Sequence, residues 1–136
     1  MIVLDSSFLV AYHNTRDTHH KAAAEVMARF LDGEWGRGLL LEYVFLEVVT
    51  VLMARCGARV ASDVADVLLA ARELDLVPCS ELFIEAVETF RSQKQTRLSF
   101  VDATIVNVAR DRAHGLVATF DRELASVREI QAIPDR

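Results

Sequence analysis

Apolar and polar residues alternate along this chain in short blocks, which predict strands interleaved with helices. Residues 2–4 are apolar and end at Asp5-Ser6-Ser7, a pattern typical of a buried strand followed by a turn. Further strands are predicted over residues 37–41, 75–78, 116–119 and 130–133. Helices are predicted from residue 8, over residues 18–31, 42–55, 60–73, 81–92 and 102–113, and from Arg122. This alternation predicts an α/β sandwich with a mainly parallel sheet of four to five strands.

Two helices in the middle of the chain have predicted caps or faces that a structure can check. The helix over residues 60–73 is expected to be capped near Ser62. The helix over residues 81–92 is expected to turn its apolar side chains inward, namely Phe83, Ile84, Val87 and Phe90.

Length and composition indicate a single folded domain over residues 1–136. The chain has 136 residues, of which 52% are hydrophobic and 26% charged, as in a compact globular domain. Its longest apolar runs fall far short of the roughly 20 residues that a membrane span needs, and Asp5 lies where a signal peptide would be basic. We therefore expect a cytoplasmic protein without membrane contact. Cys56 and Cys79 lack the paired spacing of a zinc site, so we expect reduced thiols.

The formal net charge of −5 argues against a broad basic face for nucleic acid. A local contact is still compatible with this charge, and the polar loop over residues 93–97 is the best phosphate-contact candidate. Lys94 and Arg97 lie there, immediately before the helix that carries Asp102. Arg16, Arg37 and Arg55 are further candidates for RNA contacts, although isolated arginines are usually solvated surface residues.

Three aspartates are expected at one edge of the predicted sheet. Asp5 and Asp121 follow strands, and Asp102 begins the helix that leads into the second of these strands. In a parallel sheet all three converge on the crevice where open α/β sheets bind ligands. Each also has a purely structural explanation: Asp5 and Asp121 suit helix N-caps, and Asp102 stands three residues after Ser99, as in a capping box.

Glu47 is the acid that capping does not explain. It lies in the middle of a predicted helix among Tyr43, Val44 and Val51, and an unpaired carboxylate on an apolar face is costly. Glu42 is five residues earlier, about 140° around the helix, so the two cannot serve one site equally. Glu42 fits the first turn of the helix, where the helix dipole favours a negative charge.

Several carboxylates in one crevice repel one another unless a cation lies between them. Two carboxylates about 4 Å apart repel by roughly 4 kcal/mol at an effective dielectric of 20. A hard divalent ion such as Mg²⁺ or Mn²⁺ removes this repulsion, prefers oxygen ligands and can activate a water for attack on a phosphodiester.

With these residues in place, the chain resembles the PIN-domain ribonucleases, in particular the small toxins of VapBC-type toxin-antitoxin pairs. The resemblance covers nearly the whole chain through four short motifs in family-like order: Ile2-Val3-Leu4-Asp5-Ser6-Ser7, Tyr43-Val44-Phe45-Leu46-Glu47, Leu98-Ser99-Phe100-Val101-Asp102-Ala103 and Ala118-Thr119-Phe120-Asp121. It departs from relatives that open the third helix with Ser or Thr, because this chain has Glu42 there.

The resemblance implies a PIN-like three-layer sandwich and hydrolysis of RNA that depends on Mg²⁺ or Mn²⁺. It assigns metal binding and catalysis to Asp5, Glu47, Asp102 and Asp121. It gives Ser6 and Thr119 the hydroxyl positions that hydrogen-bond the carboxylates or their waters. It also implies homodimerisation and inhibition by an antitoxin whose tail enters the acidic groove.

Other functions remain open at this stage. One alternative is a non-catalytic PIN-like module that binds RNA or protein, and another is an RNA-processing nuclease without an antitoxin. A phosphoacceptor receiver domain is set aside, because its acceptor aspartate would follow the third strand, where this chain has Pro78-Cys79-Ser80.

Overall fold

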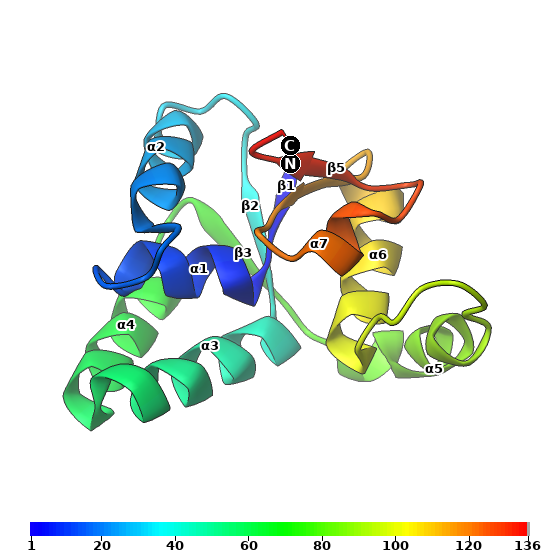
Figure 1. Ribbon diagram of the computed structural model, residues 1–136, viewed down its shortest axis with the longest axis horizontal. Helices are drawn as coiled ribbons and strands as arrows, with labels where there is room; N and C mark the ends of the chain where they lie inside the picture. Colours follow the sequence, from blue (N-terminus) through cyan, green and yellow to red (C-terminus); the bar gives the residue numbers. More distant parts are fainter. Residues whose placement is uncertain (136) are drawn as a thin grey trace.

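The computed structural model describes residues 1–135 and has a central sheet with helices on both sides (Figure 1). Its strands are β1 (Ile2–Leu4), β2 (Gly38–Leu41), β3 (Leu74–Val77), β4 (Leu116–Ala118) and β5 (Gln131–Ile133). Its helices are α1 (Ser6–His13), α2 (His20–Leu31), α3 (Glu42–Cys56), α4 (Ala58–Ala70), the 3₁₀ turn η1 (Ser80–Leu82), α5 (Phe83–Arg91), α6 (Phe100–Arg112) and α7 (Arg122–Ala125).

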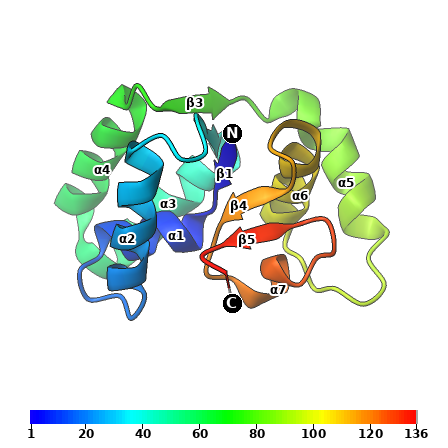
Figure 2. The same ribbon diagram turned by 90° about the horizontal axis from the view of Figure 1, so that it is seen from above.

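The sheet has the strand order β3-β2-β1-β4-β5, and every pairing is parallel. Helices α1 to α4 lie on one side of it and α5 and α6 on the other (Figure 2). The predicted three-layer α/β sandwich with a parallel sheet is therefore confirmed. The order also reverses direction between β1 and β4, which creates a switch point between these two strands.

The central strands β1 and β2 consist mainly of apolar residues and lie in the hydrophobic core. All residues of β1 and β2 are buried, as a parallel sheet covered on both faces requires. The largest buried side chains include Phe8, Leu9 and Ile105, which fill the two helical layers. None of the helices within residues 1–135 is long and apolar enough to cross a membrane. Cys56 and Cys79 are free thiols, as expected.

Two predictions about the helices are wrong. Helix α4 begins at Ala58, after Gly57 with φ of 92°, and not near Ser62. In α5 the predicted inward residues Phe83, Ile84 and Phe90 are 47%, 68% and 43% exposed, and the buried residue is Ala86. The physical reason is that α5 packs mainly on α6, so only a narrow stripe of its apolar surface is covered.

Candidate active site

The switch point between β1 and β4 positions the first acid. Asp5 directly follows β1, and its backbone N–H donates to the carbonyl of Ala118 at the end of β4 across 3.0 Å. Its side chain is only 2% exposed. Asp5 is also the N-cap of α1, since its carboxylate accepts a hydrogen bond from the Ser6 N–H at 2.7 Å. Asp5 therefore caps helix α1 and also lies at the switch point where a ligand site is expected.

Two hydroxyl groups fix the second oxygen of the Asp5 carboxylate. Oδ2 accepts hydrogen bonds of 2.7 Å from both Ser7 Oγ, in the first turn of α1, and Thr119 Oγ1, just after β4. Burial raises the pKa of Asp5; the bonds from Thr119, Ser7 and Ser6 oppose the rise, and the charge of Glu47 adds to it. The carboxylate is thus held rigidly in a place that disfavours a negative charge without a cation.

Glu47 reaches the same place from α3. Its Oε1 accepts a hydrogen bond from Ser6 Oγ, so one serine joins Asp5 and Glu47. Glu42 does not take part: its Oε1 accepts a 2.7 Å bond from the Cys79 N–H, on the β3 side of the helix start. The difference in direction between the two glutamates agrees with their spacing on the helix.

Asp102 forms the capping box and still faces the other acids. Its N–H donates to Ser99 Oγ at 3.1 Å, and its Oδ2 accepts from the Ser99 N–H at 3.2 Å. Burial first, then the charges of Asp5 and Asp121, raise the pKa of Asp102 to about 6, against the lowering effect of the Ser99 bonds. The capping box uses only Oδ2 of the carboxylate. Asp102 can therefore cap the helix with Oδ2 and present Oδ1 to the crevice at the same time.

Asp121 completes the set as the N-cap of α7. Its Oδ1 accepts from the N–H groups of Glu123 at 2.9 Å and Leu124 at 3.4 Å. Its own N–H donates to Thr119 Oγ1 at 3.0 Å, so Thr119 connects it to Asp5. The buried Thr119 hydroxyl therefore lies between two of the four acids, as expected for a residue that positions carboxylates.

Ser7 is a site residue that the sequence reasoning missed. Its hydroxyl donates to Asp5, accepts from the Phe120 N–H at 2.9 Å and lies 3.2 Å from Thr119 Oγ1. The available signal was its place in the first helical turn after Asp5, from which a short side chain can turn back to the cap residue. The network around Asp5 thus contains three hydroxyl groups, those of Ser6, Ser7 and Thr119.

The four acids suit a hard divalent cation by their chemistry. All their side-chain ligand atoms are oxygen. The charge of Glu47 helps to raise the pKa of Asp5, and the charges of Asp5 and Asp121 help to raise the pKa of Asp102. Within residues 1–135 no three His, Cys, Asp or Glu side chains form a ready-made metal cluster. Mg²⁺ is commonly held by one or two carboxylates together with waters and substrate phosphates, so such a cluster is not required.

Within residues 1–135, the basic residues predicted to contact phosphate form no ion pair with the four acids. Lys94 lines a hollow formed by the α5–α6 loop together with Leu98 and Val127. The backbone N–H of Arg97 donates to Glu123, and its side chain is exposed. Arg37 is bound to Asp75 at 2.7 Å at the opposite end of the strands. RNA contacts of Lys94 and Arg97 therefore remain a prediction.

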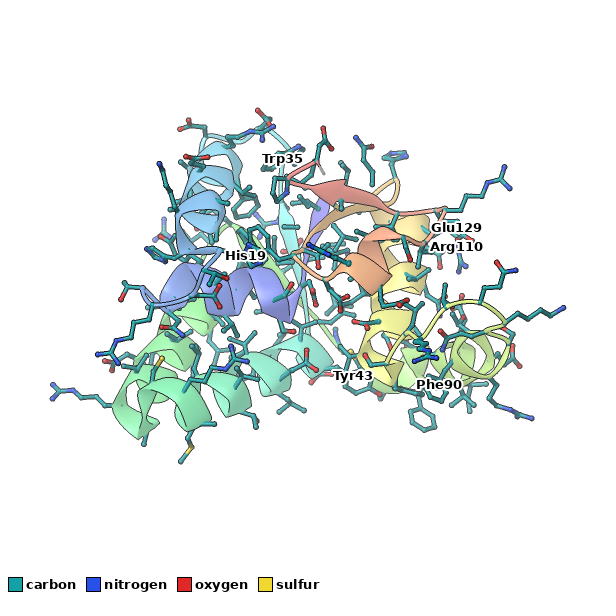
Figure 3. All side chains as sticks on the ribbon, in the orientation of Figure 1. His19, Trp35, Tyr43, Phe90, Arg110 and Glu129 are labelled. Atoms are coloured by element: carbon teal, nitrogen blue, oxygen red, sulfur yellow. The ribbon has the colours of Figure 1, made fainter. Side chains whose placement is uncertain are left out.

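The crevice is bordered by aromatic side chains on both sides. His19 stacks on Phe120 with ring centroids 4.5 Å apart and an interplanar angle of 7°. On the other side Tyr43 contacts Phe100 at 6.0 Å, close to the exposed ring of Phe90 (Figure 3). The acidic centre thus lies between two surfaces that offer flat rings.

Comparison with known proteins is consistent with this geometry. The structure is similar to that of VapC20 from Mycobacterium tuberculosis, described as a toxin that cleaves the sarcin-ricin loop, with 26% identity, a TM-score of 0.83 and coverage of 96% of this chain and 99% of that one. It shares its fold with a chain of a toxin-antitoxin complex from Klebsiella pneumoniae, with 14% identity, a TM-score of 0.64 and 96% of both chains covered. No curated protein sequence matches the chain.

Membership of a family follows from the sequence itself. The sequence profile of the PIN domain matches residues 2–130, which contain all four acids and every strand that borders the crevice. The match covers far more than half of the chain and agrees with the structural similarity to VapC20. The chain belongs to the PIN domain family.

Proposed function

We propose that this protein is a metal-dependent endoribonuclease and the toxin of a type II toxin-antitoxin pair. The observation that carries the proposal is the buried Asp5 carboxylate, fixed by three donors at the switch point and faced by Glu47, Asp102 and Asp121. The similarity to VapC20, described as a toxin that cleaves the sarcin-ricin loop, supports RNA as the substrate class. Membership of the PIN domain family supports the reaction class.

The residues of this chain have distinct roles in the proposed reaction. Asp5, Glu47, Asp102 and Asp121 would hold Mg²⁺ or Mn²⁺, which would supply an activated water and neutralise charge on the phosphodiester. Ser6 orients Glu47 and Asp5 relative to each other, while Ser7 and Thr119 fix the second Asp5 oxygen. These contacts preorganise the acids, so that little rearrangement is needed when substrate arrives.

Cleavage assays with purified protein test the proposal. RNA that contains the sarcin-ricin loop is the first substrate to try, with total RNA as the broader one, each with Mg²⁺, with Mn²⁺ and with a chelator. We expect metal-dependent cleavage that Asp5→Asn abolishes and that the exposed control Asp66→Asn on α4 retains. Full activity of Asp5→Asn would overturn the assignment of the site.

The same assays decide between the nuclease and the non-catalytic module. RNA binding without any metal-dependent cleavage would favour the module. Cleavage by a protein that has no small antitoxin encoded beside it would favour an RNA-processing nuclease. Co-purification with the product of the neighbouring reading frame, together with loss of cleavage in that complex, would support the antitoxin.

Homodimerisation is part of the proposal as well. Exposed apolar side chains gather over α3 and α5, where Leu46, Phe83 and Ile84 are 59%, 47% and 68% exposed. Apolar surface of this kind beside a functional crevice is typical of an interaction surface. Light scattering during gel filtration measures the mass in solution. We expect a dimer for the wild type and a monomer for Leu46→Asp.

A further inference from the structure

A surface groove made of two adjoining hollows leads from Glu47 along α3 to a pair of arginines. Its first part is lined by Ser6, Ser7, Glu47, His19, Phe120 and Arg55. Its second part is lined by Asn14, Arg16, Cys56 and again Arg55. Arg55 borders both parts, so the two hollows adjoin at its side chain, and the first of them reaches Glu47, one of the four acids. We call this second part the arginine end.

Helix α3 sets the distance between the two ends of the groove. Glu47 and Arg55 are eight residues apart, which is about 12 Å along the helix axis. Val51 lies midway and lines the first part of the groove. Helix α3 therefore carries both Glu47, an acid of the proposed catalytic centre, and the positively charged Arg55 about two turns further along.

Neither arginine of this groove forms an ion pair within residues 1–135. In the part of the chain that the structure describes, the ion pairs use Arg29, Arg37 and Arg110, and neither Arg16 nor Arg55. Both side chains are exposed beside the groove. Asp17 follows Arg16 in sequence and lines the first part of the groove together with Arg55, and its Oδ1 accepts the His19 N–H at 2.8 Å.

The loop that carries Arg16 is ordered by its own hydrogen bonds. Asn14 Oδ1 accepts the Arg16 N–H at 3.1 Å, and the Asp17 N–H donates to the Asn14 carbonyl at 3.0 Å. His20 Nδ1 lies 2.9 Å from the carbonyl of Ala11 and attaches the start of α2 to α1. Arg16 is thus held at the end of α3, so little backbone entropy is lost when a ligand binds there.

We propose that Arg55 and Arg16 bind a backbone phosphate of the RNA strand, at a nucleotide away from the bond that is cleaved. The inference depends on the proposed ribonuclease function and adds the path of the substrate. Guanidinium groups match phosphate oxygens in bidentate geometry. A cationic end also offsets the repulsion between RNA and the acidic centre, in a protein whose net charge is −5.

Binding and cleavage assays on arginine variants test this substrate path. Binding of a short, fluorescently labelled single-stranded RNA is measured by anisotropy with a chelator present, over a series of salt concentrations. We expect Arg55→Gln and Arg16→Gln each to weaken binding by about tenfold. The slope of log K against log salt should fall by about 0.7 for each lost phosphate contact.

Arg112→Gln is the matched control. Arg112 is exposed at the far end of α6, ten residues or about 15 Å along the helix from Asp102. We expect it to retain the wild-type affinity and salt slope. In cleavage assays Arg55→Gln should raise KM and leave kcat nearly unchanged, because the contact is remote from the cleaved bond.

The possible outcomes separate this inference from the proposed function. Unchanged affinity and salt slope in both arginine variants would overturn the RNA path, even if Asp5→Asn abolished cleavage. Failure of the wild type to bind RNA at low salt would overturn it as well. If the arginine variants lost affinity while no RNA was cleaved under any metal condition, the path would stand and the nuclease proposal would fail.

Discussion

The Thr119 hydroxyl donates a 2.7 Å hydrogen bond to Oδ2 of Asp5 and accepts one of 3.0 Å from the Asp121 N–H. Replacing Thr119 by Val keeps the shape but removes both contacts. Leaving the partly buried Asp121 N–H unpaired should cost about 1 kcal/mol in stability. We also expect the metal concentration for half-maximal cleavage to rise by about 10- to 100-fold.

Denaturant unfolding and a metal titration of cleavage measure the two effects of Thr119→Val separately. Thr119→Ser retains the hydroxyl and should recover most of the metal affinity. A folded Thr119→Val protein with the wild-type metal requirement would contradict a positioning role.

A second prediction contrasts the two glutamates of α3. Glu47 shares Ser6 with Asp5, whereas Glu42 accepts the Cys79 N–H. We expect Glu47→Gln to reduce cleavage by at least about tenfold, because one of the proposed metal ligands is lost. Glu42→Gln keeps a carbonyl acceptor for Cys79 and should cleave RNA like the wild type. Equal losses in both variants would mean that Glu42 assists at the site.

A third prediction concerns the pH dependence of stability in the metal-free protein. The pKa of Asp102 is raised from its ordinary 3.8 to about 6 by burial and by the charges of Asp5 and Asp121. The folded state therefore binds this proton more tightly than the unfolded state, so the contribution is present below about pH 4 and is lost as the pH rises through about 6.

In the Asp102→Asn variant no charge develops at this position, so no stability is lost there as the pH rises. The asparagine side-chain oxygen can still accept the Ser99 N–H. We expect the variant to be more stable than the metal-free wild type by about 1–2 kcal/mol at neutral pH, after allowance for solvent screening of a partly exposed group. The two proteins should differ little at pH 4. Urea unfolding at both pH values checks this, and a difference that does not change with pH would refute the explanation.

A fourth prediction tests the turn between α6 and β4. Gly115 has φ of 80°, and a Cβ placed there would lie 2.2 Å from the carbonyl oxygen of Glu129. Gly115→Ala should therefore destabilise the protein by about 2–4 kcal/mol, through left-handed strain and a backbone clash. Gly33, with φ of 87°, has open space around it, so Gly33→Ala should cost only about 1–2 kcal/mol. Thermal unfolding compares the two, and equal losses would show that the clash is relieved elsewhere.

Much of the fold could be predicted because short apolar runs bounded by polar residues define strands. The run that ends at Asp5 and the one that ends near Thr119 correspond to β1 and β4, and their parallel pairing brings Asp5 and Asp121 to the switch point. The capping box at Ser99 and Asp102 was also predictable, since it depends on a local spacing.

The remaining features depend on tertiary contacts that no local pattern contains. Ser7 joins Asp5 to Phe120 across more than a hundred residues, and Glu42 pairs with Cys79. Apolar periodicity indicated an inward face for Phe83, Ile84 and Phe90 but not whether another element would cover it. The groove to Arg16 likewise exists only because the α1–α2 loop lies against the end of α3.

Three of the four acids are also helix-start residues: Asp5 and Asp121 are N-caps, and Asp102 belongs to a capping box. Asparagine caps a helix about as well as aspartate. A single change from aspartate to asparagine at these positions therefore removes a charge and keeps the local conformation. Duplicated genes for this scaffold can lose the ability to cut RNA in one mutational step and continue as folded binding proteins, without an unstable intermediate.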